Sequence, residues 1–397
     1  MEGGNTEKNI ISKTHPTEPQ GNIKKRTARK YKKLRILYVI DSMTKDGAES
    51  QLLKTLARLP PERYEASVVL SRAEGERAAE LAAIPCVREV TTLASGNKRR
   101  HLLEKAFAIA GVVKALQPDI VHSWLWYSNF LCGLSRKCGF WRQIPFIASQ
   151  RGDYHARYGK FRLWLTEKLI YNTADILLTN SESIQRYLCQ LYPDKKIFSI
   201  PNLLELPTQM WAQPQVSETA EKLIVSVGRF APEKGHRYLI EALNLLKQQD
   251  VAWRCTFLGQ GELAAELRTL VEEYGLSAHV TFPGFCEDVF SVLLTADVFV
   301  LPSLHESSPN ALIEAMGIGM PCIASDVGGI VDLIENEKNG IRVPPQNPEA
   351  LTAALHRVLT EPDFAAVLGK NARSTVQKKF DSETSIRKLD EIYQRVL

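Results

Sequence analysis

Two basic residues follow a strand-like run in the second half of the sequence. The apolar run KLIVSV (222–227) has strand length, and Arg229 and Lys234 come after it, just before an amphipathic stretch that begins near Gly235 and predicts a helix. Cations at a strand exit, beside the unpaired N–H groups of a helix start, can hold a diphosphate without a metal ion. Two solvated loop cations are the alternative interpretation.

Two glutamates come after another apolar run, ADVFVLP. Glu306 lies in the loop behind that run, and Glu314 is eight positions further on, inside a helix predicted over 309–316. Ser307 or Ser308 is the expected cap of that helix. A ligand that lies across the helix start could place a sugar hydroxyl at Glu306 and a ribose at Glu314. Glycoside hydrolysis would need both carboxylates at one bond, one of them protonated, and the sequence gives no sign of a raised pKa.

The elements around these residues form two sets that are built alike. Apolar runs of strand length alternate with helical periods from Leu34 to about Pro201, and again from Lys222 onward. Strands that are apolar on both faces belong to parallel sheets covered by helices. A proline-rich stretch over 201–221 separates the sets. Ligands of such sheets bind at the carboxyl ends of the strands, so we expect the site in a cleft between two facing domains.

Charge and length narrow the function class. The chain has 397 residues and a net charge of +5, but residues 1–35 alone carry +7, which leaves −2 for the rest. This basic arm predicts either a solvated tail or attraction to an anionic membrane surface. The body lacks a nucleic-acid-binding signature, so no nucleic acid partner is expected. No run is long and apolar enough to span a bilayer and the start is polar, which predicts a cytoplasmic protein, peripheral on the inner face of the membrane where the arm binds lipid.

Three ordered motifs carry a resemblance to a known family. GRFAPEKG, the spaced glutamates of HESSPNALIEAM and SDVGGIVDLIENEKNGIRVPP resemble the donor-binding half of family 4 glycosyltransferases, dense from about Leu223 to Pro345. DGAES, PDIVHSW, TNSESI and IPN are similar to the family's landmarks in the first half, and residues 1–33 lie outside the resemblance. The resemblance implies retaining enzymes of the GT-B fold.

The resemblance also implies roles for particular residues. Arg229 and Lys234 would hold the donor diphosphate, Glu306 the donor sugar and Glu314 the ribose, while Gly47 would let the backbone approach the phosphates. Further donor-side candidates are Ser308, Pro309, Asn310, Gly284 and Phe285. The weaker acceptor-side candidates are His122, Tyr127, Arg151 and His155. His122 also fits a packing role at the end of a strand.

The chain departs from the family pattern at three places. Ser307 and Ser308 stand where the family usually has Gly-Phe, so the donor pocket is expected to differ in shape. Trp124 and Tyr127 occupy places where many members have a histidine near the reacting sugar, and that histidine's role cannot be transferred. Leu203 replaces the family's glycine after Asn202, at the interdomain hinge.

These observations give one expected organisation and activity. The fold class is α/β, with two Rossmann-like doubly wound parallel-sheet domains in the GT-B arrangement. The expected parts are a disordered basic arm over 1–33, an acceptor domain over 34–205, a linker over 206–221, a donor domain over 222–378, and a C-terminal helix over 379–397 that packs back on the first domain.

The predicted activity is transfer of a hexose or hexosamine from a nucleoside diphosphate, UDP-sugar favoured, to a hydroxyl of a glycan or lipid-linked acceptor. Cell-envelope or surface polysaccharide biosynthesis is the expected setting. No Asp-x-Asp occurs in the chain, so we expect no metal or other cofactor. A nucleotide-sugar epimerase and a catalytically degenerate nucleotide-sugar-binding scaffold remain the alternatives, and a phosphorylase is disfavoured because its cofactor lysine signature is not evident.

Overall fold

The computed structural model describes residues 32–72, 75–93, 101–152, 159–206 and 221–397. The basic arm up to residue 31 and the candidate His155 lie outside the described residues. Among the described residues, no helix combines the length and the apolar character that crossing a bilayer would need.

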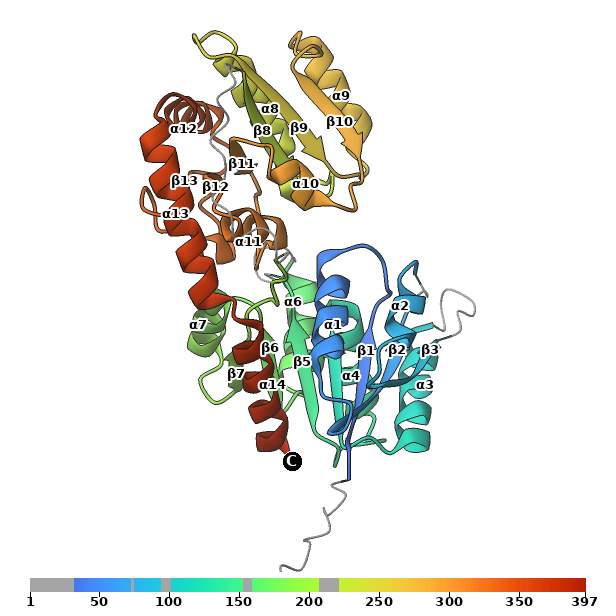
Figure 1. Cartoon of the computed structure of the whole chain (residues 1–397). Coiled ribbons are helices and arrows are strands. Elements are labelled where there is room, and N and C mark those ends of the chain that lie inside the picture. Colours follow the sequence, from blue (N-terminus) through green and yellow to red (C-terminus); the bar gives the residue numbers. More distant parts are fainter. Residues whose placement is uncertain (1–31, 73–74, 94–100, 153–158, 207–220) are drawn as a thin grey trace, which may run out of the picture. The chain divides into compact units, whose positions relative to one another are not determined.

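The first half folds around a seven-stranded parallel sheet (Figure 1), in the order β3-β2-β1-β4-β5-β6-β7. Its central strands are buried on both faces, as their continuous apolar sequences require. The strand β3 lies at one edge of the sheet and was not predicted from the sequence. Its sequence VREVTT is mostly polar and forms no continuous apolar run. The strands are β1 (Leu34–Ile40), β2 (Tyr64–Leu70), β3 (Val87–Thr92), β4 (Ile120–Trp124), β5 (Phe146–Gln150), β6 (Ile176–Thr179) and β7 (Lys196–Ser199).

Helices cover both faces of this sheet, and each face has its own core. One core joins the sheet to α1, α2 and α14, and the other joins it to α3, α4, the π-helix η1 and α7. The helices are α1 (Gly47–Arg58), α2 (Ala78–Ala82), α3 (His101–Leu116), α4 (Trp126–Lys137), α6 (Lys160–Thr166), η1 (Glu167–Tyr171), α7 (Glu182–Leu191) and α14 (Ser382–Val396). Ser181 caps α7 as its sequence predicts, accepting from the Ile184 N–H at 3.4 Å.

The second half folds around a six-stranded parallel sheet in the order β10-β9-β8-β11-β12-β13. Its strands are β8 (Lys222–Val227), β9 (Trp253–Leu258), β10 (Val280–Gly284), β11 (Val298–Leu301), β12 (Cys322–Ser325) and β13 (Ile341–Val343). The helical segments are η3 (Pro232–Lys234), α8 (His236–Leu246), α9 (Ala264–Glu273), α10 (Val289–Leu293), α11 (Asn310–Gly317), η4 (Gly328–Asp332), α12 (Pro348–Thr360) and α13 (Pro362–Lys379). Both sheets confirm the predicted pair of Rossmann-like folds.

The last helix returns to the first sheet, which confirms the sequence prediction. Asp381 caps α14 by accepting from the Thr384 N–H at 3.0 Å. Further along, the buried Tyr393 hydroxyl lies between Tyr38 and His122, 2.7 Å from the Tyr38 hydroxyl and 2.8 Å from His122 Nδ1. Residues Lys33–Leu397 form one compact unit, and the domain limits drawn from the sequence stay predictions.

Candidate functional site

The loop that leaves β8 carries the two predicted cations. Its backbone is fixed by hydrogen bonds from Gly228 N–H to the Leu258 carbonyl (3.0 Å) and from Phe230 N–H to the Gln260 carbonyl (2.8 Å). Arg229 is exposed between these anchors, and Lys234 ends the short 3₁₀ helix η3. The cations are therefore held on a fixed turn at the carboxyl end of a central strand.

Lys234 and Glu306 form an ion pair that joins the loops after β8 and β11. Lys234 Nζ lies 2.5 Å from Glu306 Oε1, and the Ser303 hydroxyl donates to the same oxygen at 3.0 Å. The Glu306 side chain is only 9% exposed. The backbone repeats the link, because the Leu304 N–H donates to the Glu233 carbonyl at 2.8 Å. Charge-assisted bonds in such a sheltered place are stronger than those on an open surface.

Glycines allow the backbones to meet around Glu306. Gly235 has φ +62°, and a Cβ there would lie 2.2 Å from the Pro302 carbonyl oxygen. In the loop after β12, a Cβ on Gly328 would lie 1.8 Å from the Glu306 carbonyl oxygen, and the Gly329 N–H donates to that oxygen at 3.0 Å. Three strand exits thus meet around Glu306, with the β8 loop at its carboxylate and the β12 loop at its backbone carbonyl, and only glycine permits this closeness.

The other residues of the β8 loop surround the ion pair. Arg229 Nη2 lies 2.6 Å from Glu233 Oε1 and stays half exposed. Below the loop, the imidazole of His236 is buried between Phe230 and Phe257, and neither ring nitrogen has a hydrogen-bond partner. Burial, helped by the Lys234 charge, lowers the pKa of His236 to about 3. His236 therefore stays neutral and supports the loop by packing.

Glu314 lies one turn into α11, as predicted, but the cap of that helix is different. Pro309 occupies the cap position and no side chain bonds there, so the expected capping by Ser307 or Ser308 is wrong. The Ser307 hydroxyl donates instead to the Asn180 side chain. Burial raises the pKa of Glu314, against the lowering effect of Lys54. This raised pKa was not predicted from the residue types, because it arises from tertiary packing.

A network of amide side chains connects the Glu306 loop with the first half of the chain. Asn310 Nδ2 donates to the Gly47 carbonyl at 3.3 Å, and a Cβ on Gly47 would lie 3.0 Å from that nitrogen. Asn202 Nδ2 donates to Asn310 Oδ1 (2.7 Å) and to the Ser308 carbonyl (3.1 Å). The candidates Gly47, Ser308 and Asn310 are therefore brought together.

The sequence prediction did not include three members of this network, Gln51, Asn180 and Asn202. Gln51 Nε2 donates to Asn310 Oδ1 at 3.3 Å and to the Leu203 carbonyl at 3.1 Å, while Gln51 Oε1 accepts from the Leu203 N–H at 2.6 Å. Asn180 and Asn202 directly follow the region of β6 and β7 in the motifs TNSESI and IPN. Their positions just after predicted strands were the sequence feature that could have identified them as site residues.

The remaining donor candidates lie at the end of β10, where Gly284 is the last residue of the strand and Phe285 follows it. Gly284 has φ +95° and its carbonyl accepts from the Gly259 N–H at 2.9 Å. The exposed Phe285 ring lies 4.7 Å from Lys45 Nζ, and Lys45 also pairs with Glu287 at 3.1 Å. The Phe285 ring is 44% exposed, so this donor-side candidate remains accessible.

The acceptor-side candidates divide into two groups. His122 is 1% exposed, its Nε2 bonds the Ser149 hydroxyl at 2.8 Å, and burial lowers its pKa well below the usual value. These contacts correspond to the packing role. Arg151 stacks 3.8 Å from the Trp124 ring and donates to Asn202 Oδ1 at 3.1 Å, which links it to the amide network. Tyr127 contacts Arg72 instead, 4.3 Å from its ring.

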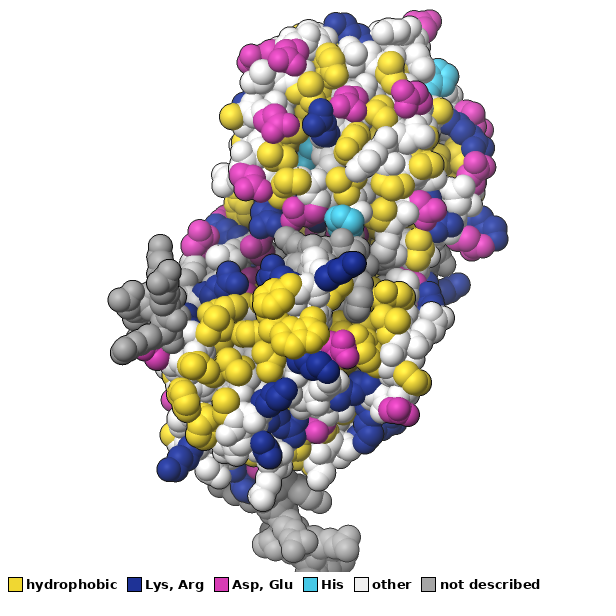
Figure 2. All heavy atoms as spheres, turned by 180° about the vertical axis from the view of Figure 1, so that it is seen from behind, with side chains coloured by type: hydrophobic (Ala, Val, Ile, Leu, Met, Phe, Trp, Pro, Cys, Tyr) yellow, Lys and Arg dark blue, Asp and Glu magenta, His cyan; other side chains and the backbone are white. Residues whose placement is uncertain are grey.

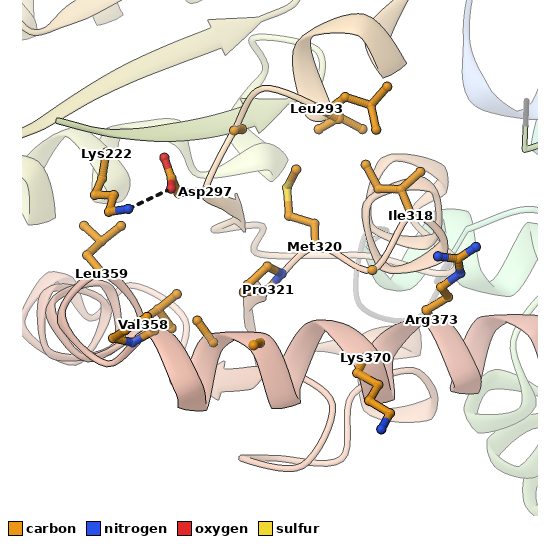
Figure 3. Close-up of a pocket in the computed structure, with 16 residues that line it drawn as sticks. Lys222, Leu293, Asp297, Ile318, Met320, Pro321, Val358, Leu359, Lys370 and Arg373 are labelled. Carbon is orange, nitrogen blue, oxygen red and sulfur yellow. Dashed lines mark hydrogen bonds and ion pairs between the residues drawn. The ribbon is translucent and has the colours of Figure 1, made fainter. Parts of the chain in front are cut away.

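A separate cavity of about 560 Å³ lies at the opposite edge of the second sheet (Figure 3). Lys222 begins β8 and Asp297 precedes β11, and the two form an ion pair of 3.2 Å on the cavity wall. The other walls include the apolar side chains of Met320 and Leu359. None of the predicted site residues lines it. The described residues also contain no group of three metal-ligating side chains, and metal independence stays a prediction.

Two family models match the chain and together cover most of it. The model of "Glycosyl transferases group 1" matches residues 208–375, and the model of "Glycosyltransferase Family 4" matches residues 45–206. The boundary between the matches falls between the two sheets.

Relatives whose names state an activity match parts of the chain. A putative colanic acid biosynthesis glycosyltransferase, WcaL of Escherichia coli K12, is 38% identical over 43% of this chain and 44% of its own length. An Escherichia coli UDP-Gal:α-D-GlcNAc-diphosphoundecaprenol α-1,3-galactosyltransferase is 28% identical over 58% of this chain and 62% of its own. The chain thus spans less than two thirds of either relative. The crystal structure of Anabaena HepE with UDP and glucose has a TM-score of 0.75 at 20% identity, covering 91% of this chain and 100% of that one, which shows the fold.

Replacing Gly235 tests the packing of the loops. Gly235→Ala is expected to lower the free energy of unfolding by at least about 2 kcal/mol, because a Cβ at positive φ would overlap the Pro302 carbonyl. Gly111→Ala is the control, since nothing lies near its Cβ in α3, and it should gain about 0.5–1 kcal/mol. Urea unfolding of both variants measures the difference. Equal effects would contradict the described packing.

Glu49, in the first turn of α1, provides a pH test. It is 4% exposed, and burial raises its pKa to about 7. A raised carboxyl pKa stabilises the fold below the unfolded pKa of 4.5, and this stability is lost as pH rises through 7. The difference in the free energy of unfolding between Glu49→Gln and wild type should therefore shift in favour of the variant by roughly 2–3 kcal/mol from pH 4.5 to pH 8.5. Denaturant unfolding at both pH values, with exposed Glu62→Gln as control, checks this; a pH-independent difference would refute it.

Proposed function

Because the chain belongs to the family 4 glycosyltransferases, we propose that it transfers a hexose or hexosamine from a UDP-sugar to a hydroxyl of a lipid-linked glycan, with retention of the anomeric configuration. The observation that carries the proposal is the Lys234–Glu306 pair, held where three strand exits of the second sheet converge. The name of one relative supports the substrate classes, since it is a UDP-Gal:α-D-GlcNAc-diphosphoundecaprenol α-1,3-galactosyltransferase.

The cations act on the leaving group. Cleavage of the bond between sugar and diphosphate leaves negative charge on the departing nucleotide. Lys234 and Arg229 are paired with Glu306 and Glu233, so their charges are fixed in place before the donor binds. The N-terminus of α8 adds its dipole at the same strand exit. Preorganised charges need no rearrangement at the moment of reaction, which is the main source of electrostatic catalysis.

The carboxylates bind the other parts of the donor. Glu306 keeps Oε2 for a sugar hydroxyl, because the hydrogen bonds that Lys234 and Ser303 donate both go to Oε1. Glu314 would receive the ribose. Gly47, from the first half of the chain, is the candidate for backbone contact with the phosphates, and Asn310, which donates to its carbonyl, is a further donor-side candidate.

We propose a front-face departure and attack for the retaining step, in which the acceptor hydroxyl adds to the face that the diphosphate leaves. An acid–base pair, as an epimerase would need in the cleft, finds no support in His122, which is buried and bonded at both ring nitrogens. The reaction is proposed to need no metal ion. We place it in envelope or surface polysaccharide biosynthesis at the cytoplasmic face of the membrane, since WcaL is named for colanic acid biosynthesis.

Loss of either cation should remove the stabilisation of the leaving group. Arg229→Ala and Lys234→Ala are each expected to lower turnover about 10²- to 10³-fold, with folding intact by circular dichroism. Release of UDP from UDP-hexoses, with a synthetic polyprenyl-diphosphate-linked sugar as acceptor and EDTA present, is the measurement. Arg237→Ala on the exposed side of α8 is the matched control. Near-normal turnover in either loop variant, or loss of wild-type activity in EDTA, would overturn the assigned roles.

A further inference from the structure

Large hydrophobic side chains are concentrated on one face of the first sheet's helices. Among the described residues, thirteen large hydrophobic side chains are exposed, and six of them lie within α3, α6 and the loop after α4. The most exposed, Phe161, is 73% accessible, and all six are at least 44% accessible. The six are Leu102, Leu103, Phe107, Phe140, Phe161 and Trp164, called here the α3–α6 face.

Four of these exposed side chains are packed in two aromatic pairs. Phe107 and Phe140 have ring centroids 5.2 Å apart in an edge-to-face arrangement, and Phe161 and Trp164 are stacked at 6.1 Å. The opposite side of α3 already fills the core with Ile109 and other apolar residues. The outward apolar side chains of α3 are therefore surplus to the fold, and a patch of this kind indicates a binding surface.

The charge of the same region is strongly positive. Over residues 101–152 and 159–171, six Lys and Arg side chains are exposed, against one acidic side chain, Glu104. Figure 2 shows hydrophobic side chains gathered on this side of the molecule, with Lys and Arg side chains next to them. The exposed cations are Lys114, Lys137, Arg142, Lys160, Arg162 and Lys168.

We infer that the α3–α6 face rests on an anionic phospholipid bilayer, with its aromatic side chains among the headgroups and its cations on the lipid phosphates. Aromatic residues favour the interface of a bilayer, and each nearby cation adds attraction to anionic lipid. Charge complementarity selects this partner over a second copy of the chain, since two such faces would bring like charges together.

The place of the face agrees with a membrane-bound acceptor, so this inference deepens the proposed function and rests on it. The residues Leu102 and Leu103 begin α3, and Phe161 and Trp164 lie in α6. Both helices start at the carboxyl edge of the first sheet, because they follow β3 and β5. That edge also holds Arg151, the acceptor-side candidate that joins the amide network. A glycan on a lipid carrier would then reach the cleft from the bilayer surface.

Vesicle binding tests the inference without donor or acceptor, so that its outcome is independent of transferase activity. The full-length chain is co-sedimented with vesicles of phosphatidylglycerol and phosphatidylethanolamine, and with phosphatidylcholine vesicles as reference. Binding is measured at low salt and at about 0.5 M salt, where screening weakens contributions from charge alone. The test variant combines Phe161→Ser and Trp164→Ser. Val367→Ser, 53% exposed on α13, is the matched control.

The double variant is expected to partition at least about tenfold more weakly than wild type into anionic vesicles, and the difference should persist at high salt. Val367→Ser should bind like wild type. Lys160→Gln with Lys168→Gln should weaken binding at low salt only. The inference is overturned if wild type does not bind anionic vesicles, if the double variant binds as well as wild type, or if wild type forms a dimer without lipid that the double variant lacks.

Discussion

The ion pair between Lys234 and Glu306 is the interaction on which the arrangement of the site depends. The Glu306 side chain is 9% exposed and its partner Lys234 is partly buried, so each charge compensates the other and the loops after β8 and β11 are held together. This contact requires parallel strands, since only then do both loops leave the sheet at the same edge. It also requires glycine at 235 and 328, where a Cβ would overlap a neighbouring carbonyl. The parallel fold and the local glycines are thus both needed to bring Lys234 and Glu306 together.

The first half of the chain contributes to the site through neutral contacts. Gln51 bridges the Asn310 side chain and the backbone of Leu203, and Asn202 links Arg151 with the loop that carries Glu306. Amide groups can donate and accept at once, which suits a junction that joins backbone and side chains from several elements. Nearby in the core of the first sheet, the Tyr393 hydroxyl of α14 lies between Tyr38 and His122 and fixes the helix there. The buried position of His122 follows from this packing.

Much of the fold could be predicted from the sequence, because buried parallel strands have continuous apolar sequences. Lys234 and Glu306 were found for the same reason, since they come directly after such runs. The amide network was not predicted, because pairs such as Gln51 and Asn310 are far apart in the chain and have no local pattern. The predicted cap of α11 was wrong because the Ser307 hydroxyl donates to Asn180, a residue far away in the sequence. The raised pKa values of Glu49 and Glu314 come from burial, which the residue types alone do not reveal.

The most direct test of the account is nucleotide-sugar binding. It is measured by thermal unfolding with a panel of UDP-, GDP- and ADP-sugars in the presence of EDTA. A ligand at 100 times its dissociation constant adds about 2.7 kcal/mol of stability. The account predicts a selective shift with a UDP-sugar for the wild-type chain, and loss of that shift in Lys234→Met and in Glu306→Gln. A shift that survives both substitutions, or no shift with any donor, would contradict the claim that this ion pair organises the donor site.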